Sequence, residues 1–240
     1  MIVVGHRGWP LAYPENTLVG FKAALDLGVD ALELDIHVTR DDHLVVIHDE
    51  ELDRTTDGKG PVREATLAEL KKLDAGRPFD EKFAGERIPT LEEVMDLVAG
   101  AVPLAVEVKS PGETTDRLND RLVPLIERYD GHVIVHSFDA DYLRTFRTLS
   151  PDVDTGYLCK ASQETIALAV EMGCKALHPA WQTVTPELNR AIRNAGLKIL
   201  TWIARTEDDC RRILDTLDVD AIGADCPDVL IRLLEERGER

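Results

Sequence analysis

The sequence contains no apolar run approaching the ~18 residues that would span a membrane, and it is poor in basic residues. Lysine and arginine together number 28, against 45 aspartates and glutamates, so the formal net charge is −17. Nucleic acids and anionic membrane surfaces are bound by clustered basic side chains. The charge balance therefore argues against both as partners, and the lack of a long apolar run argues against stable membrane insertion.

The chain also lacks paired cysteines and any visible leader. None of its four cysteines forms a C-x-x-C pair, and the first residues enter a strand pattern with no basic and apolar leader before them. We therefore expect reduced thiols and a cytoplasmic location. The sequence shows no repeat, low-complexity tract or linker, so we expect one domain over residues 1–240, as a monomer or homodimer.

What the sequence does contain is a regular alternation of short apolar, β-prone runs with amphipathic stretches. The predicted strands are Ile2–Val4, Ala31–Val38, Leu104–Val108, Val133–Ser137, Thr155–Leu158, Ala176–His178, Lys198–Ile203 and Asp220–Gly223. Eight strand–helix units predict a parallel sheet closed into a (β/α)₈ TIM barrel. The alternative is an open doubly wound sheet, but the Gly-x-Gly-x-x-Gly turn that favours it is absent after the first strand.

One segment departs from this alternation. The β-prone run Leu44–His48 follows the second strand too closely for a parallel crossover, so it predicts an antiparallel return. A two-residue turn at Asp41-Asp42 would pair Arg40 with His43 and Asp35 with His48. Residues at about 49–89 then form a small lobe inserted after the second strand, on the catalytic face of the barrel.

Carboxylates concentrate where barrel strands end, which is where active sites of this fold lie. Glu33 and Asp35 share one face of the second strand, and Glu107 and Lys109 share one face of the next. Three carboxylates that converge need a shared proton or a cation, and an all-oxygen site suits Mg²⁺ or Ca²⁺ better than zinc. The alternative is that these acids form separate structural salt bridges.

His6 and His48 are the candidates for proton transfer, one accepting a proton from the attacking oxygen and the other donating one to the leaving oxygen. Each could instead be a structural hydrogen-bonding histidine. The same two interpretations, catalytic or structural, apply to His136 and His178. Arg7 could grip phosphate oxygens or neutralise carboxylates, as could Lys109.

Four further residues are candidates for supporting the site. Asn16 could ligate a metal or a phosphate through its amide, and Glu15 could ligate the metal, orient a histidine or balance Arg7. Trp202 and Phe138 could form the apolar wall of a substrate pocket or belong to the core.

Several short fragments follow one another in order along the chain: His-Arg-Gly (6–8), Pro-Glu-Asn-Thr (14–17), Glu-Leu-Asp (33–35), Val-Ile-His-Asp (46–49), Leu-Asp-Arg-Thr-Thr-Asp-Gly (52–58), Ile-Pro-Thr-Leu-Glu-Glu (88–93), Glu-Val-Lys (107–109), His-Ser-Phe (136–138) and Thr-Trp (201–202). Taken in this order, the fragments resemble the glycerophosphodiester phosphodiesterase family. Each fragment is weak alone, but their order and spacing extend over nearly the whole chain.

The resemblance implies a TIM barrel that splits a small-molecule glycerophosphodiester into sn-glycerol 3-phosphate and an alcohol. It implies a divalent metal, Mg²⁺ or Ca²⁺, on Glu33, Asp35 and Glu107, with Glu15 and Asn16 in the same cluster. His6 and His48 fall on the acid–base pair of the family, Arg7 and Lys109 on its phosphate contacts, and Trp202 on its glycerol side.

The sequence departs from the family pattern at two late motifs, where Arg205 replaces the usual asparagine and Ala224 precedes Asp225. We expect Arg205 to favour an anionic or polar head group. Three other interpretations remain: a lyase-type cleavage of lysophospholipids to cyclic phosphates on the same barrel, a non-catalytic binding relative, and an unrelated metal-dependent barrel enzyme. The sequence leaves open whether water or the glycerol hydroxyl attacks phosphorus.

Overall fold

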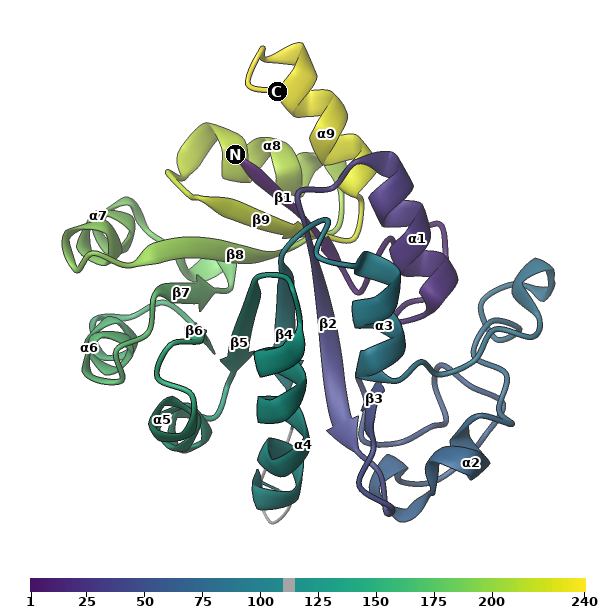
Figure 1. Ribbon diagram of the computed structural model, residues 1–240. Helices are drawn as coiled ribbons and strands as arrows, with labels where there is room; N and C mark the ends of the chain where they lie inside the picture. The colour runs from purple at the N-terminus through teal and green to yellow at the C-terminus, as the bar shows by residue number, and fades with distance from the viewer. Residues whose placement is uncertain (110–114) are drawn as a thin grey trace.

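The computed structural model describes residues 1–109 and 115–240, and parallel strands form the centre of the molecule (Figure 1). In spatial order, the barrel strands are β1 (Ile2–His6), β2 (Ala31–Val38), β4 (Leu104–Val108), β5 (Val133–Ser137), β6 (Asp154–Cys159), β7 (Ala176–Pro179), β8 (Lys198–Ala204) and β9 (Ala221–Ala224). Strand β1 pairs with both β2 and β9, so the sheet closes on itself. The predicted TIM barrel is confirmed.

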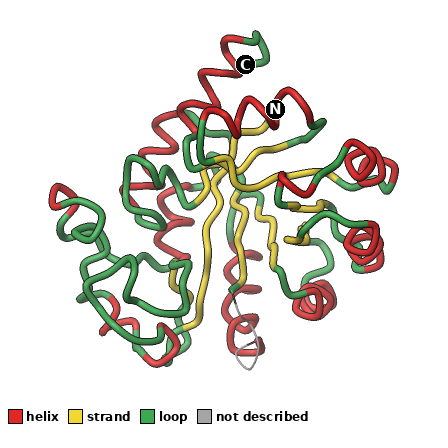
Figure 2. Tube along the Cα trace, turned by 180° about the vertical axis from the view of Figure 1, so that it is seen from behind, coloured by secondary structure: helices red, strands yellow, loops and turns green. Residues whose placement is uncertain are grey.

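Helices surround the strands, as the view from behind shows (Figure 2). They are α1 (Leu18–Leu27), α3 (Leu91–Val98), α4 (Thr115–Arg128), α5 (Ala140–Leu149), α6 (Gln163–Glu171), α7 (Pro186–Asn194), α8 (Glu207–Thr216) and α9 (Pro227–Glu236). Helix α3 begins with a capping box formed by Thr90 and Glu93. Among the helices of the described residues, none is long and apolar enough to cross a membrane.

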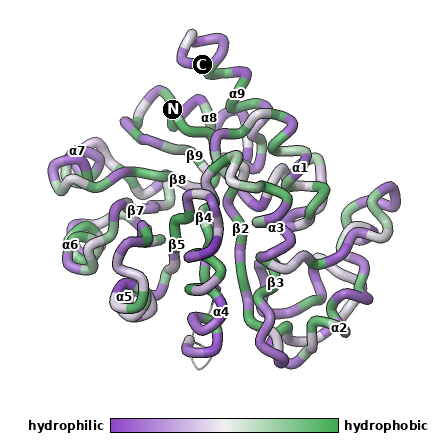
Figure 3. The backbone as a smooth tube through the Cα atoms, viewed as in Figure 1, coloured by the Kyte–Doolittle hydropathy of each residue, from purple (hydrophilic) through white to green (hydrophobic). Residues whose placement is uncertain are grey.

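Strand β2 shows how the sequence divides the barrel wall from the barrel interior. All of its residues are buried, and its apolar side chains Leu32, Leu34 and Ile36 belong to the core shared with the helices. The alternate positions carry Glu33 and Asp35, which therefore face the inside of the barrel. In the hydropathy colouring, green residues gather along central strands such as β5, whereas the surrounding helices mix green and purple (Figure 3).

The strand after β2 is antiparallel, as predicted, but the predicted register is wrong by one residue. Strand β3 (Leu44–Val46) pairs Val46 with Ile36, and the N–H of Ile47 donates to the carbonyl of Asp35. The turn holds three residues instead of two, because Asp42 adopts a left-handed conformation with φ of 63°. A type I turn extended by such a residue is a common three-residue hairpin connection.

Beyond β3 the chain leaves the barrel and forms a loop-rich segment, which includes α2 and lies beside β3 (Figure 1). It contains the short helices η1 (Val62–Glu64), α2 (Leu67–Leu70) and η2 (Glu81–Phe83), and another single-turn helix, η4 (Trp181–Thr183), follows β7. A small apolar cluster beneath this segment includes Val45, Leu52 and Leu70 and is separate from the main core. The cluster fixes the segment against the hairpin.

The Asp74 carboxylate holds this lobe together. Its Oδ1 accepts hydrogen bonds from the N–H groups of Gly76 and Arg77, and its Oδ2 accepts one from Gly85. The pKa of Asp74 is lowered by the hydrogen bond from Arg77, against the effect of burial, and by those from Gly85 and Gly76. A carboxylate with a lowered pKa stabilises the fold above its unfolded-state pKa, and this contribution is lost as the pH falls.

We expect Asp74→Ala to lower the free energy of unfolding by about 2 kcal/mol near neutral pH, because three backbone donors lose a charged acceptor. The matched control is Asp80→Ala, since Asp80 lies at an exposed helix start, where it accepts a backbone hydrogen bond from the Lys82 N–H and pairs with the Lys82 ammonium. Urea denaturation at neutral pH and below pH ~4 measures both variants. Equal effects of the two variants, or a loss for Asp74→Ala that does not shrink in acid, would contradict this account.

Candidate active site

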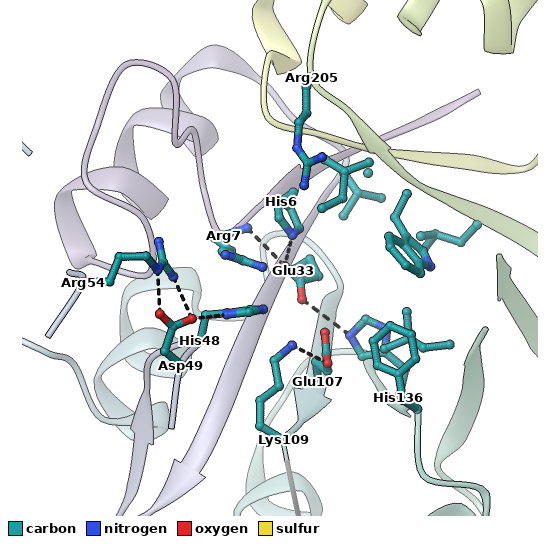
Figure 4. A pocket seen from close by; sticks show the side chains of 17 residues that line it. His6, Arg7, Glu33, His48, Asp49, Arg54, Glu107, Lys109, His136 and Arg205 are labelled. Atoms are coloured by element: carbon teal, nitrogen blue, oxygen red, sulfur yellow. Dashed lines mark hydrogen bonds and ion pairs between the residues drawn. The ribbon is translucent and has the colours of Figure 1, made fainter. Parts of the chain in front are cut away.

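A cavity of about 350 Å³ opens at the carboxyl ends of the barrel strands. Its lining contains both candidate proton-transfer residues, His6 and His48, and Figure 4 shows their rings at the edge of the same space as Glu33 and Glu107. The cations and aromatics in its lining are Arg7, Arg54, Lys109, Arg205, Phe138 and Trp202. Four basic side chains in an otherwise acidic protein give this cavity the chemistry of an anion site.

Two carboxylates and one imidazole meet at the inner end of the cavity. Donor atoms of Glu33 on β2, Glu107 on β4 and His136 on β5 lie within 4.8 Å of one another, and all three residues are buried. The sheet register explains the approach, because Glu107 pairs with His136 across two adjacent strands. His136 was not assigned to this group from the sequence, where only its position at a strand end was visible.

The two buried carboxylates of this group have raised pKa values, although Lys109 contacts Glu107. Burial raises the pKa of Glu33 well above its ordinary value, and the carboxylates of Asp35 and Glu107 raise it further. Burial raises the pKa of Glu107 to about 7, with a contribution from Asp35. Such a pair keeps its negative charge only if a cation is close by, and the mixed oxygen and nitrogen donors suit a divalent metal.

Asp35 lies outside this group and is surrounded by cations. Its Oδ2 is 3.1 Å from Arg7 Nε and accepts from Asn16 Nδ2 at 2.8 Å, while its Oδ1 is 3.1 Å from Lys109 Nζ. Burial acts to raise the pKa of Asp35, but the charges of Lys109 and Arg7 hold it far below its ordinary value. Lys109 also contacts Glu107 and so links the two acids.

Each of the two candidate catalytic histidines has a carboxylate behind its ring. His6 Nδ1 is 2.6 Å from Asp225 Oδ1, and His48 Nδ1 is 2.6 Å from Asp49 Oδ1. A carboxylate that accepts the Nδ1 proton leaves Nε2 as the nitrogen available for proton transfer. His6 Nε2 is 3.9 Å from Glu33 Oε2, so His6 borders the carboxylate group directly.

The environment of His48 favours its neutral form. Burial lowers the pKa of His48, as do the charges of Lys109 and Arg7, and these effects outweigh the opposing contribution of Asp35. At neutral pH the ring is therefore able to accept a proton at Nε2.

Arg54 belongs to the site, although its role could not be predicted from the sequence. Its guanidinium donates to Asp49 at 2.6 and 3.0 Å and to Glu15 at 2.8 and 2.9 Å. The two hydrogen bonds from Arg54 to Asp49 lower the pKa of Asp49 and fix the carboxylate that contacts His48 Nδ1. Glu15 also accepts from Arg7 at 3.0 Å, so it aligns two arginines at the cavity edge. The only signal in the sequence was the position of Arg54 within a matching fragment.

The apolar side of the cavity is formed by Phe138 and Trp202. The two rings meet edge to face, with centroids 5.5 Å apart, and Phe138 is 52% exposed. Trp202 Nε1 donates to the carbonyl of His178 at 2.7 Å, which fixes the indole in place. The exposure of Phe138 identifies it as pocket wall and not core.

Comparisons with known proteins point to one family. A family model described as the glycerophosphoryl diester phosphodiesterase family matches residues 6–229. A glycerophosphodiester phosphodiesterase of Caldanaerobacter subterraneus is 40% identical over 241 residues, covering 99% of each chain. One of Bacillus subtilis is 34% identical, covering 90% of this chain and 80% of its own.

A solved structure extends the likeness to three dimensions. The Oleispira antarctica phosphodiesterase, solved in complex with the product sn-glycerol-3-phosphate, superposes with a TM-score of 0.93 at 27% identity. The superposition covers 98% of this chain and 97% of that one.

Proposed function

The chain belongs to the glycerophosphoryl diester phosphodiesterase family and is a glycerophosphodiester phosphodiesterase, and we propose that two histidines and a divalent cation carry out its reaction. The products are sn-glycerol 3-phosphate and an alcohol, which agrees with the product named for the Oleispira antarctica structure. The observation that supports this mechanism best is the arrangement of His6 and His48, each backed by a carboxylate, in one cavity with Glu33 and Glu107.

His48 accepts a proton from the attacking water, because its ring is neutral and its Nε2 is available. Water adds to phosphorus, and the bond from phosphorus to the oxygen of the leaving alcohol breaks. His6, which must enter this step protonated on Nε2 as well as on Nδ1, donates the Nε2 proton to that oxygen. His48 ends the step protonated and His6 ends it neutral, and proton exchange with water restores both rings. Asp225 and Asp49 keep the two rings oriented during both transfers.

A cation, Mg²⁺ or Ca²⁺, would be held by the carboxylates of Glu33, Asp35 and Glu107. When bound, it stabilises the negative charge that develops on the phosphate oxygens, which is worth several kcal/mol. Glu33 and Glu107 need such a charge, since both are buried and have raised pKa values. Asp35 would complete this carboxylate set, and Lys109, which is now paired with Asp35, would then be available to the phosphate.

Lys109 and Arg7 then contact the phosphate. In this structure both are neutralised by carboxylates of the site, Lys109 by Asp35 and Glu107 and Arg7 by Glu15. Asn16 holds Asp35 in place through its amide, and Glu15 aligns Arg7. Trp202 and Phe138 contact the apolar face of the glycerol moiety.

The reaction is tested by identifying its products. Incubation of the purified full chain with glycerophosphocholine is expected to release sn-glycerol 3-phosphate and choline in equal amounts. A persistent cyclic phosphate would instead favour the lyase-type reaction, and no release of either product would contradict the proposed function.

Arg205 is positioned to influence the choice of head group. It lines the cavity, its side chain is exposed, and its Nε lies 3.4 Å from Asp225 Oδ2. We expect Arg205→Asn to lower the kcat/KM ratio of glycerophosphoinositol to glycerophosphocholine by about 2–5-fold, the effect of one exposed charge. The control is Arg212→Asn, since Arg212 is an exposed arginine on α8 paired with Asp208. An unchanged substrate ratio would exclude this role.

A further inference from the structure

A second buried imidazole lies behind the one that faces the carboxylates. His178 on β7 is fully buried, and its Nδ1 is 2.9 Å from the Nδ1 of His136. The rings meet edge to face, with centroids 4.9 Å apart. The opposite nitrogen of His136, Nε2, is 3.7 Å from Glu33 Oε1 and has no hydrogen-bond partner among the described residues.

The contact between the two rings controls which nitrogen of His136 carries its proton. Only one of the two Nδ1 atoms can donate in a hydrogen bond between neutral imidazoles. If His136 donates, its Nε2 is a bare lone pair directed at Glu33 and Glu107. If His178 donates, His136 carries its proton on Nε2 and presents an N–H to the same carboxylates, where it would exclude a cation.

The surroundings of the His178 ring indicate that its role is to set the tautomer of His136. The ring of His178 lies against Gly156 of β6. A Cβ atom at position 156 would come within 2.4 Å of His178 Nε2, so the glycine leaves the space that this ring occupies. Among the described residues, His178 Nε2 has no hydrogen-bond partner, and His136 is the partner of Nδ1. An apolar side chain would fill this position without leaving a buried nitrogen unpaired, so packing alone does not explain a histidine.

We propose that His178 is a positioning residue that accepts the Nδ1 proton of His136 and thereby presents the Nε2 lone pair of His136 to the divalent cation, as a nitrogen ligand beside Glu33 and Glu107. This inference rests on the metal dependence proposed above. It adds His136 as a metal ligand and His178 as the residue that sets the tautomer of His136. Mn²⁺ prefers carboxylate oxygen, but it accepts an imidazole nitrogen more readily than Mg²⁺ or Ca²⁺ does, and the later transition metals accept one more readily still. The site is therefore expected to bind Mn²⁺ more tightly than carboxylates alone would predict.

The test is calorimetric titration of MnCl₂ and, separately, MgCl₂ into the chelator-treated full chain. His178→Leu removes the acceptor and is expected to weaken Mn²⁺ binding by about 10–100-fold, the usual effect of losing a residue that orients a metal ligand. Mg²⁺ binding is expected to weaken less. His178→Asn keeps an acceptor oxygen close to the position of Nδ1 and is expected to retain most of the Mn²⁺ affinity. The matched control is His132→Leu, since His132 is exposed and remote from the cavity.

A spectroscopic measurement keeps the test independent of whether His178→Leu folds. Long-range proton–nitrogen NMR of isotope-labelled wild type is expected to show His136 protonated at Nδ1, with its Nε2 signal moving when diamagnetic Zn²⁺ is added. A His136 that remains protonated at Nε2 in the Zn²⁺-loaded protein would overturn the inference. So would equal Mn²⁺ affinities in wild type and His178→Leu, whereas a wild type that binds no divalent cation would overturn the metal-dependent function as well.

Discussion

Replacing His6 or His48 with alanine is expected to lower kcat by about 10²–10⁴ in each case, because each variant loses one proton transfer. KM is expected to change little, since binding of the ester depends on Arg7, Lys109 and the cation. Metal affinity is also expected to stay close to that of wild type. Steady-state kinetics with glycerophosphocholine, combined with calorimetric titration of Mg²⁺, measures all three quantities.

Two exposed histidines provide matched controls for this experiment. His43 directly follows the β2–β3 turn and His132 precedes β5, and neither lines the cavity. Their alanine variants are expected to keep wild-type turnover. If His6→Ala or His48→Ala also kept it, the assigned role of that residue would be wrong.

Removal of divalent metal is expected to lower turnover by at least about 10³-fold, because several kcal/mol of charge stabilisation is lost at about 1.4 kcal/mol for each factor of ten. The loss should be reversible on addition of Mg²⁺ or Ca²⁺. Activity is measured after treatment with EDTA and gel filtration, with each metal restored separately. The metal that restores more activity is the better candidate for the native ion.

Variants of the carboxylates show whether a loss of activity after chelation is due to loss of the metal or to other damage by the chelator. Glu107→Gln keeps the shape of the side chain but removes a charge from the buried group. It is expected to need a higher Mg²⁺ concentration for half-maximal activity, whereas Asp80→Gln, in the exposed part of the lobe, is expected to need the same concentration as wild type. Full activity of the metal-stripped wild type would contradict metal dependence.

The barrel could be predicted from the sequence because its strands are short apolar runs separated by amphipathic helices. The predicted bounds of β2, β4 and β5 coincide with those observed. The hairpin register could not be predicted in the same way. It depends on whether one residue of the turn, Asp42, takes a left-handed backbone, and the residue types allowed both a two-residue and a three-residue turn.

The site was predictable to the extent that strand ends determine it. The structure places Glu33, Glu107, His6 and His48 around one cavity, as their positions at strand ends led us to expect. The roles of Arg54 and His178 depend on contacts between distant segments. Arg54 reaches Glu15 from 39 residues away, and the two Nδ1 atoms of His136 and His178 meet across 42 residues. Contacts between residues so far apart in the sequence depend on the closed barrel and the packed lobe, and no local sequence pattern indicates them.

Anomalous diffraction from crystals grown with Mn²⁺ and sn-glycerol 3-phosphate would test the central arrangement most directly. We expect one Mn²⁺ ion bonded to oxygens of Glu33, Asp35 and Glu107 and to a phosphate oxygen, with Nε2 of His6 and Nε2 of His48 on opposite sides of the phosphate. An ion bound away from these carboxylates, or a phosphate with both imidazoles on one side, would contradict the account.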